Sequence, residues 1–404
     1  MGPVVVGALA RGAYWRFVTP DWEPISDADH YLRLARSLAS GTGFSMAFPQ
    51  LEMHATAFRP PLYPLLLAIV EWVGGADVLW PARLLSLVLG LAVIALTVKL
   101  GERLAGPTSG FVAGGMVAVY PPLVANDTIT LSEPLALLLI LGILLKLHDR
   151  RWVACGVLTG LLLLTRPNAY LVVVVVVAAL WRLIGHRRAL LSACVCAAVV
   201  SPWIIRNQIQ VDTIRPTTSD GFTLAAMYAP PAREHKTFVN PVYDTWYDGT
   251  EFELLQFDEA RWSSALTDLA LDTISDDPSY VVTVARRNTI AFFELDTSAN
   301  ETAERFDGRN IDFRTATLPL FYVVTILGLM AIALNIRRRA VWPTLAIAAQ
   351  FTVLSLLIVA PPRLRAPFDL TMCIGVGLLA EGIRQRYAIV DVPPRRPAPS
   401  RSRP

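Results

Sequence analysis

Two carboxylates, Asp27 and Asp29, stand close together near the start of a chain that is otherwise strongly apolar. A carboxylate in such a position can accept a proton from a hydroxyl group and act as a general base. The same acids can instead serve the backbone. Ser26 followed by Asp29 fits a capping box, and acidic residues in a first turn complement the helix dipole. From these residues alone the two interpretations have similar support, and both can hold at once.

Basic residues that could bind an anion lie in short turns beside apolar runs. Arg59 stands directly before two prolines in FRPPLYP, residues 58–64. Guanidinium groups make fork-like contacts to phosphate oxygens, although a single arginine at a membrane boundary is explained as well by lipid head groups. Four more arginines occur in similar turns, together with an acid and an amide that flank them: Arg166, Arg206, Arg363, Arg365, Glu133 and Asn207. Together with Arg59, these four arginines indicate an anionic ligand.

The composition indicates which structural elements hold these acidic and basic side chains in place. The 404 residues are 54% hydrophobic and 17% charged, whereas soluble domains are about a quarter charged. About 20 apolar residues cross a bilayer as a helix. Nine segments approach this length, namely 82–100, 109–123, 133–147, 152–166, 168–184, 189–205, 317–336, 341–360 and 367–383. The sequence therefore predicts an all-α polytopic membrane protein of about 10–11 transmembrane helices, and no nucleic acid as a partner.

Two further apolar segments have less certain character. The first runs from Val4 to about Val18, is short, and carries Arg11 and Arg16. Either the chain begins upstream or this helix lies partly in the interface. The second, residues 61–75, is expected to span the membrane or to lie at its surface. Ser132 and Pro134 predict a helix start at Glu133.

The distribution of basic residues predicts the orientation of the helices. Every second connection is rich in lysine or arginine and is assigned to the cytoplasm. The alternate connections, among them 19–60 and 206–316, then lie outside. The stretch 212–316 carries 19 acidic and 9 basic residues and is long enough for a small extracytoplasmic domain. The Pro- and Arg-rich end, residues 384–404, is predicted to be a disordered cytoplasmic tail.

The outer loop 19–60 contains one predicted helix of its own. Tyr31, Leu34, Ala35 and Leu38 repeat at helical spacing, and Gly41 is a plausible stop. This helix is too short to span and is expected to lie along the outer surface, with the two acids at its start.

Several motifs occur in an order that resembles the GT-C membrane glycosyltransferases, in particular the protein O-mannosyltransferase and aminoarabinose transferase superfamily, which is family 39-like. They are Asp27-x-x-x-Tyr31, Gly41-x-Gly43-Phe44, Arg59-Pro60-Pro61, LSEPLALLL, LTRPNAYL, PWIIRN with TTSDGF, and RLRAPFDL. The resemblance covers about residues 25–225 and 360–380. It implies a GT-C bundle in residues 1–211 with its catalytic loop at 19–60, C-terminal helices in 317–383, and an acceptor-selecting role for 212–316.

The resemblance also implies a reaction. A polyprenyl-phosphate sugar is the donor, a glycan, lipid or protein hydroxyl is the acceptor, and an aspartate base drives an inverting transfer of mannosyltransferase type. By position Asp27 corresponds to that base, with Asp29 as the alternative, and Arg59 corresponds to the phosphate ligand. The resemblance leaves a divalent metal open as a cofactor, and no spacing in the chain singles out its ligands. The expected location is a bacterial plasma membrane.

Two other functions are compatible with such a chain. A transporter or flippase of lipid-linked sugars would carry charged or broken helices near the membrane midplane, whereas the charges here gather at one face. A non-catalytic accessory protein of the same fold would tolerate changes of Asp27 and Asp29. The enzyme is the favoured prediction.

Overall fold

The computed structural model describes residues 1–48, 51–74, 79–242 and 258–390, and in this part the protein is almost entirely helical. The predicted all-α class is confirmed. The described residues contain one small antiparallel ribbon, in which β1 (Ser45–Met46) pairs with β2 (His54–Ala55). Most of the expected cytoplasmic tail lies outside the described residues.

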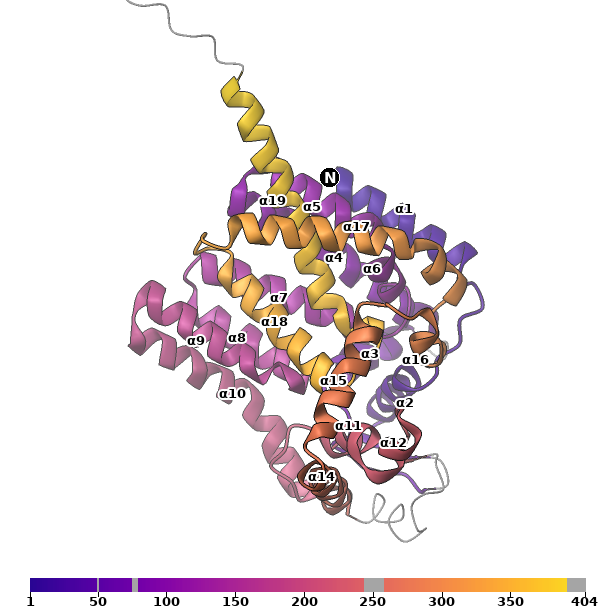
Figure 1. Ribbon diagram of the computed structural model, residues 1–404. Helices are drawn as coiled ribbons and strands as arrows, with labels where there is room; N and C mark the ends of the chain where they lie inside the picture. The colour runs from indigo at the N-terminus through magenta and orange to yellow at the C-terminus, as the bar shows by residue number, and fades with distance from the viewer. Residues whose placement is uncertain (49–50, 75–78, 243–257, 391–404) are drawn as a thin grey trace, which may run out of the picture.

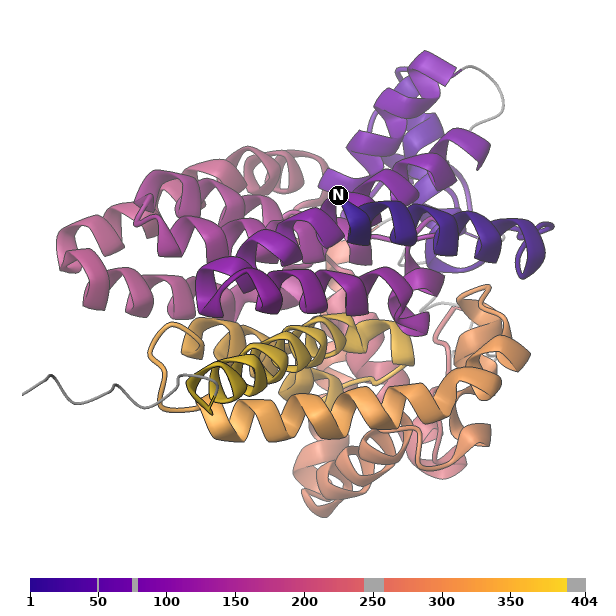
Figure 2. The same cartoon turned by 90° about the horizontal axis from the view of Figure 1, so that it is seen from above.

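The main bundle contains the predicted membrane segments. Eight of the nine lie mainly on one helix each, and 109–123 runs from one helix into the next. The helices of the main bundle are α1 (Gly2–Phe17), α3 (Leu62–Gly74), α4 (Leu79–Ala105), α5 (Pro107–Val119), α7 (Glu133–His148), α8 (Trp152–Leu163), α9 (Tyr170–Ile184), α10 (His186–Val211), α17 (Ile311–Asn335), α18 (Trp342–Leu357) and α19 (Ala366–Val390). Five described helical segments are long and apolar enough to cross a membrane: Leu79–Ala105, Pro167–Ile184, His186–Val211, Ile311–Asn335 and Pro362–Tyr387. The C-terminal α19 packs against both α5 and α17 (Figure 2).

Shorter helices form the connections between the helices of the main bundle. They are α2 (Asp27–Ala39), α6 (Pro121–Asn126), α11 (Ser219–Tyr228), α12 (Pro230–His235), α14 (Glu259–Asp276), α15 (Ser279–Phe292) and α16 (Glu301–Phe306), with single turns η1 (Pro167–Ala169), η2 (Thr297–Asn300) and η3 (Pro362–Arg365). In Figure 1, α2, α11, α12 and α14 lie together at the lower right. One apolar cluster joins Phe44 and Phe58 of the first loop to Trp262 and Leu266 of α14. The first loop and the long 206–316 connection therefore share a core.

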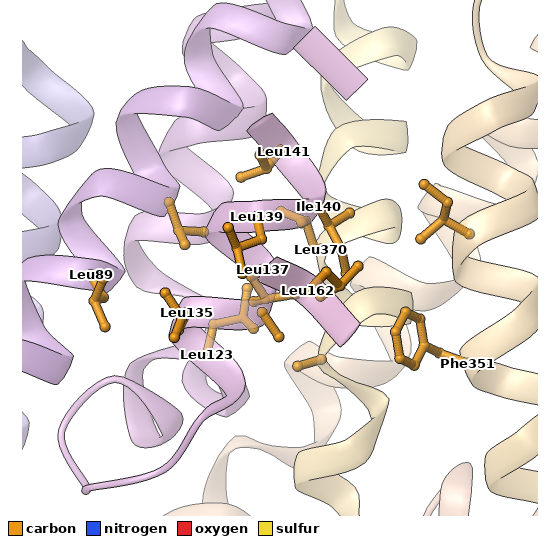
Figure 3. Close-up of a cluster of buried hydrophobic side chains, with 14 of the residues drawn as sticks. Leu89, Leu123, Leu135, Leu137, Leu139, Ile140, Leu141, Leu162, Phe351 and Leu370 are labelled. Carbon is orange, nitrogen blue, oxygen red and sulfur yellow. The ribbon is translucent and has the colours of Figure 1, made fainter. Parts of the chain in front are cut away.

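Helix α7 lies at the centre of the bundle because it is apolar on all sides. Its leucines and isoleucines are buried almost throughout. Figure 3 shows Leu135, Leu137 and Leu139 of α7 among side chains from neighbouring helices, including Phe351 and Leu370. A buried helix of this kind holds its first residue, Glu133, at a fixed place.

Glycines let neighbouring helices approach closely. Gly156 and Gly160 on α8 are spaced four apart and lie against α10. A Cβ at these positions would stand 2.4 Å from Ser192 O and 2.7 Å from Val199 Cβ, respectively. Small residues at this spacing are typical of helix contacts in membranes, where burial of apolar surface from water supplies no driving force.

Arg11 of α1 points into the bundle. Arg11 is fully buried, and its Nε donates to Asp127 Oδ2 at 2.8 Å. A further bond runs from Arg11 Nη1 to Ala118 O at 3.0 Å. The sequence did not reveal this pairing, because the partner acid lies 116 residues away.

The predicted helix caps are also wrong in part. Helix α2 begins at Asp27 and is followed by Gly41 with a φ of 80°, as the expected stop requires. Neither Ser26 nor Ser132 makes a side-chain capping bond. Ser26 has a φ of 52° and ψ of −120°, so its hydroxyl is not directed at the first amides of the helix. The Ser26–Asp29 capping box is therefore absent, although both Asp27 and Asp29 lie in the first turn of α2, where a carboxylate complements the helix dipole.

Candidate functional site

Asp27 lies in the first turn of α2 with both carboxylate oxygens bound by arginines. Arg59 Nη2 bonds to Oδ1, and Arg363 Nη2 donates to Oδ2 at 2.5 Å. Burial alone would raise the pKa of Asp27, but the positive charges of Arg59 and Arg363 outweigh it and hold the pKa well below its usual range. In this state Asp27 is ionised and is a weak base.

Arg363, from the turn η3, connects three carboxylates that come from distant parts of the chain. Besides Asp27, its Nη1 lies 3.6 Å from Glu133 Oε1 and its Nε lies 3.0 Å from Asp307 Oδ1. Each nitrogen of the guanidinium therefore faces a different acid. Arg363 is the centre of the site.

Glu133 and Arg166 complete the network. Arg166 Nη1 donates to Glu133 Oε1 at 2.9 Å. The other oxygen of Glu133 and Asp307 Oδ2 are both buried and have no hydrogen-bond partner among the described residues. Buried polar atoms without partners are costly, so in a folded protein they mark places where a ligand or water binds. We call this cluster the acid–arginine network; its members are Asp27, Arg59, Glu133, Arg166, Asp307 and Arg363.

Tyr31 packs beside the network rather than joining it. Its ring is buried beneath Arg59, whose guanidinium carbon lies 5.9 Å from the ring centroid, and meets Tyr63 edge-on at 5.1 Å. Its hydroxyl lies 3.3 Å from Ser132 Oγ, next to Glu133. Tyr31 thus connects the two turns that carry Arg59 and Glu133.

His30 was not among the predicted site residues, yet it contacts Arg59 directly. His30 Nδ1 lies 2.9 Å from Arg59 Nη2 and 3.3 Å from its Nε, and so it acts as an acceptor. Burial and the charge of Arg59 lower the pKa of His30 to about 3, although Asp27 acts in the opposite direction. The imidazole is neutral at ordinary pH. Its position three residues after Asp27, on the same helix face, was the available sequence signal.

Asp29 lies outside the acid–arginine network. Its carboxylate pairs with Arg33 at 2.7 Å on the exposed side of α2, and the Arg33 side chain is 49% exposed. The structure thus separates the two acids that the sequence left as alternatives. Asp27 pairs with Arg59 and Arg363 inside the network, and Asp29 pairs with Arg33 at the surface of the protein.

Arg206 supports the fold of the first loop and Asn207 that of the segment after α10, and among the described residues neither is bonded to the network. Arg206 donates to the backbone oxygens of Thr56 at 2.6 Å and Phe44 at 2.7 Å. Asn207 donates to Arg215 O at 3.0 Å. The bonds of Arg206 fix the open end of the β1–β2 ribbon to α10, and the bond of Asn207 fixes the segment that follows α10.

Arg365 belongs to a different buried ion cluster. Its Nη2 donates to Glu294 Oε1 at 2.7 Å, its Nη1 to Phe292 O at 2.7 Å, and its Nε lies 3.2 Å from Asp369. Arg365 and Arg363 are two residues apart in a single turn, so their side chains leave it in different directions. Arg365 therefore has its own partners and holds η3 in place.

The donor set of the acid–arginine network does not fit a divalent metal. Both oxygens of Asp27 are taken by guanidinium groups, and a bound cation would face three arginines. In the described part of the chain no three His, Cys, Asp or Glu side chains are arranged to hold a metal ion. The groups of the network that remain able to bind a ligand are the guanidinium groups of Arg59, Arg166 and Arg363, whose ligands are anions.

The fold is that of the GT-C membrane enzymes, as the sequence resemblance predicts. Residues 58–205 match the family model described as dolichyl-phosphate-mannose-protein mannosyltransferase. Comparison with curated proteins gives no match. The oligosaccharyltransferase of Archaeoglobus fulgidus in its apo form is 14% identical, with a TM-score of 0.53, and the alignment covers 96% of this chain and 51% of that chain.

Two liganded structures are also similar. AglB from Archaeoglobus fulgidus, in complex with an inhibitory peptide and a dolichol-phosphate, is 11% identical with a TM-score of 0.52, over 98% of this chain and 52% of that one. ArnT from Cupriavidus metallidurans, bound to undecaprenyl phosphate, is 15% identical with a TM-score of 0.41, over 98% and 82%. This chain spans about half the length of the oligosaccharyltransferase.

Proposed function

We propose that this chain is an integral membrane glycosyltransferase that moves a sugar from a polyprenyl-phosphate donor to an acceptor hydroxyl on the extracytoplasmic face. The observation that carries the proposal is the meeting of Asp27, Arg59 and Arg363, which come from the first outer loop and the last turn of the bundle. A candidate base and two candidate phosphate ligands are thereby in direct contact. The family match over residues 58–205 and the dolichol-phosphate bound by the similar AglB fold support the donor class.

In the proposed reaction the arginines first bind the donor phosphate, and Asp27 then accepts a proton. A donor phosphate offers Arg59 and Arg363 another anion, which weakens their hold on Asp27 and returns its pKa toward the ordinary range. Asp27 then accepts the proton of the acceptor hydroxyl. The hydroxyl oxygen attacks the anomeric carbon, the lipid phosphate leaves, and the configuration inverts. Neutralisation of the phosphate by the arginines, Arg166 included, favours its departure.

The remaining residues have supporting roles in this proposal. Tyr31 and Glu133 hold Arg59 and Arg166 in place, and Asp29 takes no part. Arg206 and Arg365, which the sequence suggested as ligands of the donor phosphate, and Asn207, a further site candidate, act on the fold of the loops instead. The acceptor is a glycan, lipid or protein hydroxyl, and the membrane is the bacterial plasma membrane.

The experiment that tests the proposal is transfer of radiolabelled sugar in membranes that contain the full chain. The donors are a panel of polyprenyl-phosphate sugars that includes mannose and arabinose. Asp27→Asn is expected to lower the rate at least about 100-fold, and the matched variant Asp29→Asn to leave it within about twofold. Protein levels must be equal in all membranes.

The outcomes separate the competing functions. Loss of transfer in Asp29→Asn alone keeps the enzyme and overturns the assignment of the base. No transfer by the wild type from any donor overturns the proposed function and favours a transporter or an accessory protein. Flipping of a labelled lipid-linked sugar in proteoliposomes then distinguishes these two.

A further inference from the structure

Asp307 is the member of the acid–arginine network with the fewest partners, and it lies in a firmly held turn. It follows α16, and its amide donates to Ala303 O at 2.9 Å. The next residue, Gly308, has a φ of 69° and packs so closely on Trp22 that a Cβ there would stand 2.1 Å from the indole nitrogen. The turn is therefore tied to the start of the first outer loop. Asp307 cannot move far without disturbing both segments.

The contacts of Asp307 differ from those of the other two acids. Its Oδ1 lies 3.0 Å from Arg363 Nε, and Arg363 is its one ion-pair partner among the described residues. Asp27 has two arginines, and Glu133 has Arg166 at 2.9 Å in addition to Arg363. Asp307 is 8% exposed, and its Oδ2 has no hydrogen-bond partner in the described structure. Its contact with Arg363 is an ion pair without a hydrogen bond, and within the described structure Asp307 is the one acid of the network whose ion pairing depends on Arg363 alone.

The charge balance of the network makes the release of Arg363 by one acid necessary. Three carboxylates face three guanidinium groups, so the free site is close to neutral. A lipid phosphodiester would add one negative charge to a buried space, where an uncompensated charge is costly. Each nitrogen of Arg363 already faces an acid. A phosphate can therefore reach this guanidinium only when one acid withdraws or becomes neutral.

Asp307 is also the acid that is easiest to neutralise. Burial raises the pKa of Asp307 to about 7 against the opposing charge of Arg363. The other charged groups around it are Glu304 on α16 and Asp27 on α2, which add to the rise, and Arg309, which opposes it. An incoming negative charge would raise the pKa further. Asp27, by contrast, is held strongly ionised by its two arginines.

We propose that Asp307 is a positioning residue that holds Arg363 in the free protein, and that it takes up one proton from solvent and releases Arg363 when a lipid phosphate binds. This inference rests on the proposed function, because it assumes that a lipid phosphate is the ligand. No bond to the sugar is made or broken in this step. The proton moves from water to the Asp307 carboxylate, and the phosphate replaces that carboxylate beside Arg363.

The test is calorimetric binding of a polyprenyl methyl phosphate, a phosphodiester with one fixed negative charge and no sugar, to the purified full chain in detergent. Titrations at pH 8 in two buffers of different ionisation enthalpy give the number of protons taken up per ligand. The wild type is expected to take up close to one proton. Asp307→Asn is expected to take up none and to bind about tenfold more tightly than the wild type at pH 8, with equal affinity at pH 6. Asp312→Asn, an exposed acid five residues along the chain, is the control and should match the wild type.

The possible results are distinct. If the wild type binds the phosphodiester without proton uptake, the inference is overturned even if the variant folds poorly, because this measurement needs no variant. Equal uptake in Asp307→Asn and the wild type overturns the assignment to Asp307. Absence of binding by the wild type also overturns it. The sugar-transfer assay decides the proposed function separately, so an enzyme that transfers sugar without proton uptake keeps the function and loses this inference.

Discussion

Arg363 Nη2 lies 2.5 Å from Asp27 Oδ2, although 336 residues separate the two in the chain. The segment between α1 and α3 supplies the acid, and the turn before α19 supplies the guanidinium. The site is therefore completed only when the C-terminal helices have packed against the N-terminal part of the bundle. In Figure 2 this is the contact of α19 with α5.

Replacing Arg363 by lysine tests how much the guanidinium shape matters. Arg363→Lys keeps the charge but cannot face three carboxylates at once, because an ammonium is a compact point charge. We expect kcat/KM for sugar transfer to fall at least about tenfold. Arg233→Lys, at an exposed pair with Asp277, is the matched control and should have no effect. A lysine variant with wild-type kcat/KM would show that Arg363 acts through charge alone.

The contact between His30 and Arg59 predicts a pair of variants with different effects. The His30 ring meets Phe48 and Phe58 edge-on at 5.7 and 5.9 Å. His30→Phe therefore keeps the packing but removes the acceptor for Arg59, and the donor KM should rise about three- to tenfold. His30→Asn keeps an oxygen near the position of Nδ1 and should retain most of the affinity. Equal KM values in the two variants would contradict a role for the hydrogen bond.

The sequence predicted the helices and the turns of the site better than the direction of its side chains. Periodicity and hydropathy are local properties, so the membrane segments and the helix at 27–39 could be located from them. The single turn η3 holds Arg363 inside the acid–arginine network and Arg365 outside it. Two arginines that are two residues apart in one short turn look alike in sequence, and only packing decides which one faces Asp27.

The residues that were missed had weak signals for a similar reason. Asp307 is one of 19 acids in the stretch 212–316, and nothing in its neighbours distinguishes it. Arg11 and Asp127 had a clearer signal, since each is a charge within an apolar region, and opposite charges in such places usually pair. Their pairing could have been predicted from the position of each charge within an apolar segment.

The Arg11–Asp127 pair predicts strong coupling between two substitutions. Arg11→Met leaves the buried Asp127 carboxylate without its partner and should lower the free energy of unfolding by about 3–5 kcal/mol. The double variant Arg11→Met with Asp127→Leu removes both charges and should recover most of that loss. Denaturation of the purified protein in detergent measures both. Arg16→Met, at an exposed position of the same helix, is the control. Additive effects of the two substitutions would contradict the pairing.

The ion pair between His54 and Glu259 connects the β1–β2 ribbon to α14. His54 Nε2 lies 3.7 Å from Glu259 Oε2, while Glu259 Oε1 accepts a bond from the Ala57 amide at 2.9 Å. Burial lowers the pKa of His54, but the nearby Glu259 carboxylate and the hydrogen bond between His54 Nδ1 and Glu52 O together outweigh burial, and the pKa is raised above its ordinary value. A charged His54 thus stabilises the folded loop.

The stability of the loop should therefore depend on pH in a defined direction. Because the folded-state pKa of His54 is raised, its contribution is fully present below the unfolded-state pKa of about 6.5 and is lost as the pH rises through the folded-state pKa. We expect the wild-type Tm to fall by about 1–2 °C between pH 6 and pH 8.5 relative to His54→Phe, which keeps the stack on Phe48 but cannot ionise. His235→Asn, exposed on α12, controls for general histidine titration. If His54→Phe shows the same fall in Tm as the wild type, the pH dependence arises elsewhere and this ion pair does not stabilise the loop.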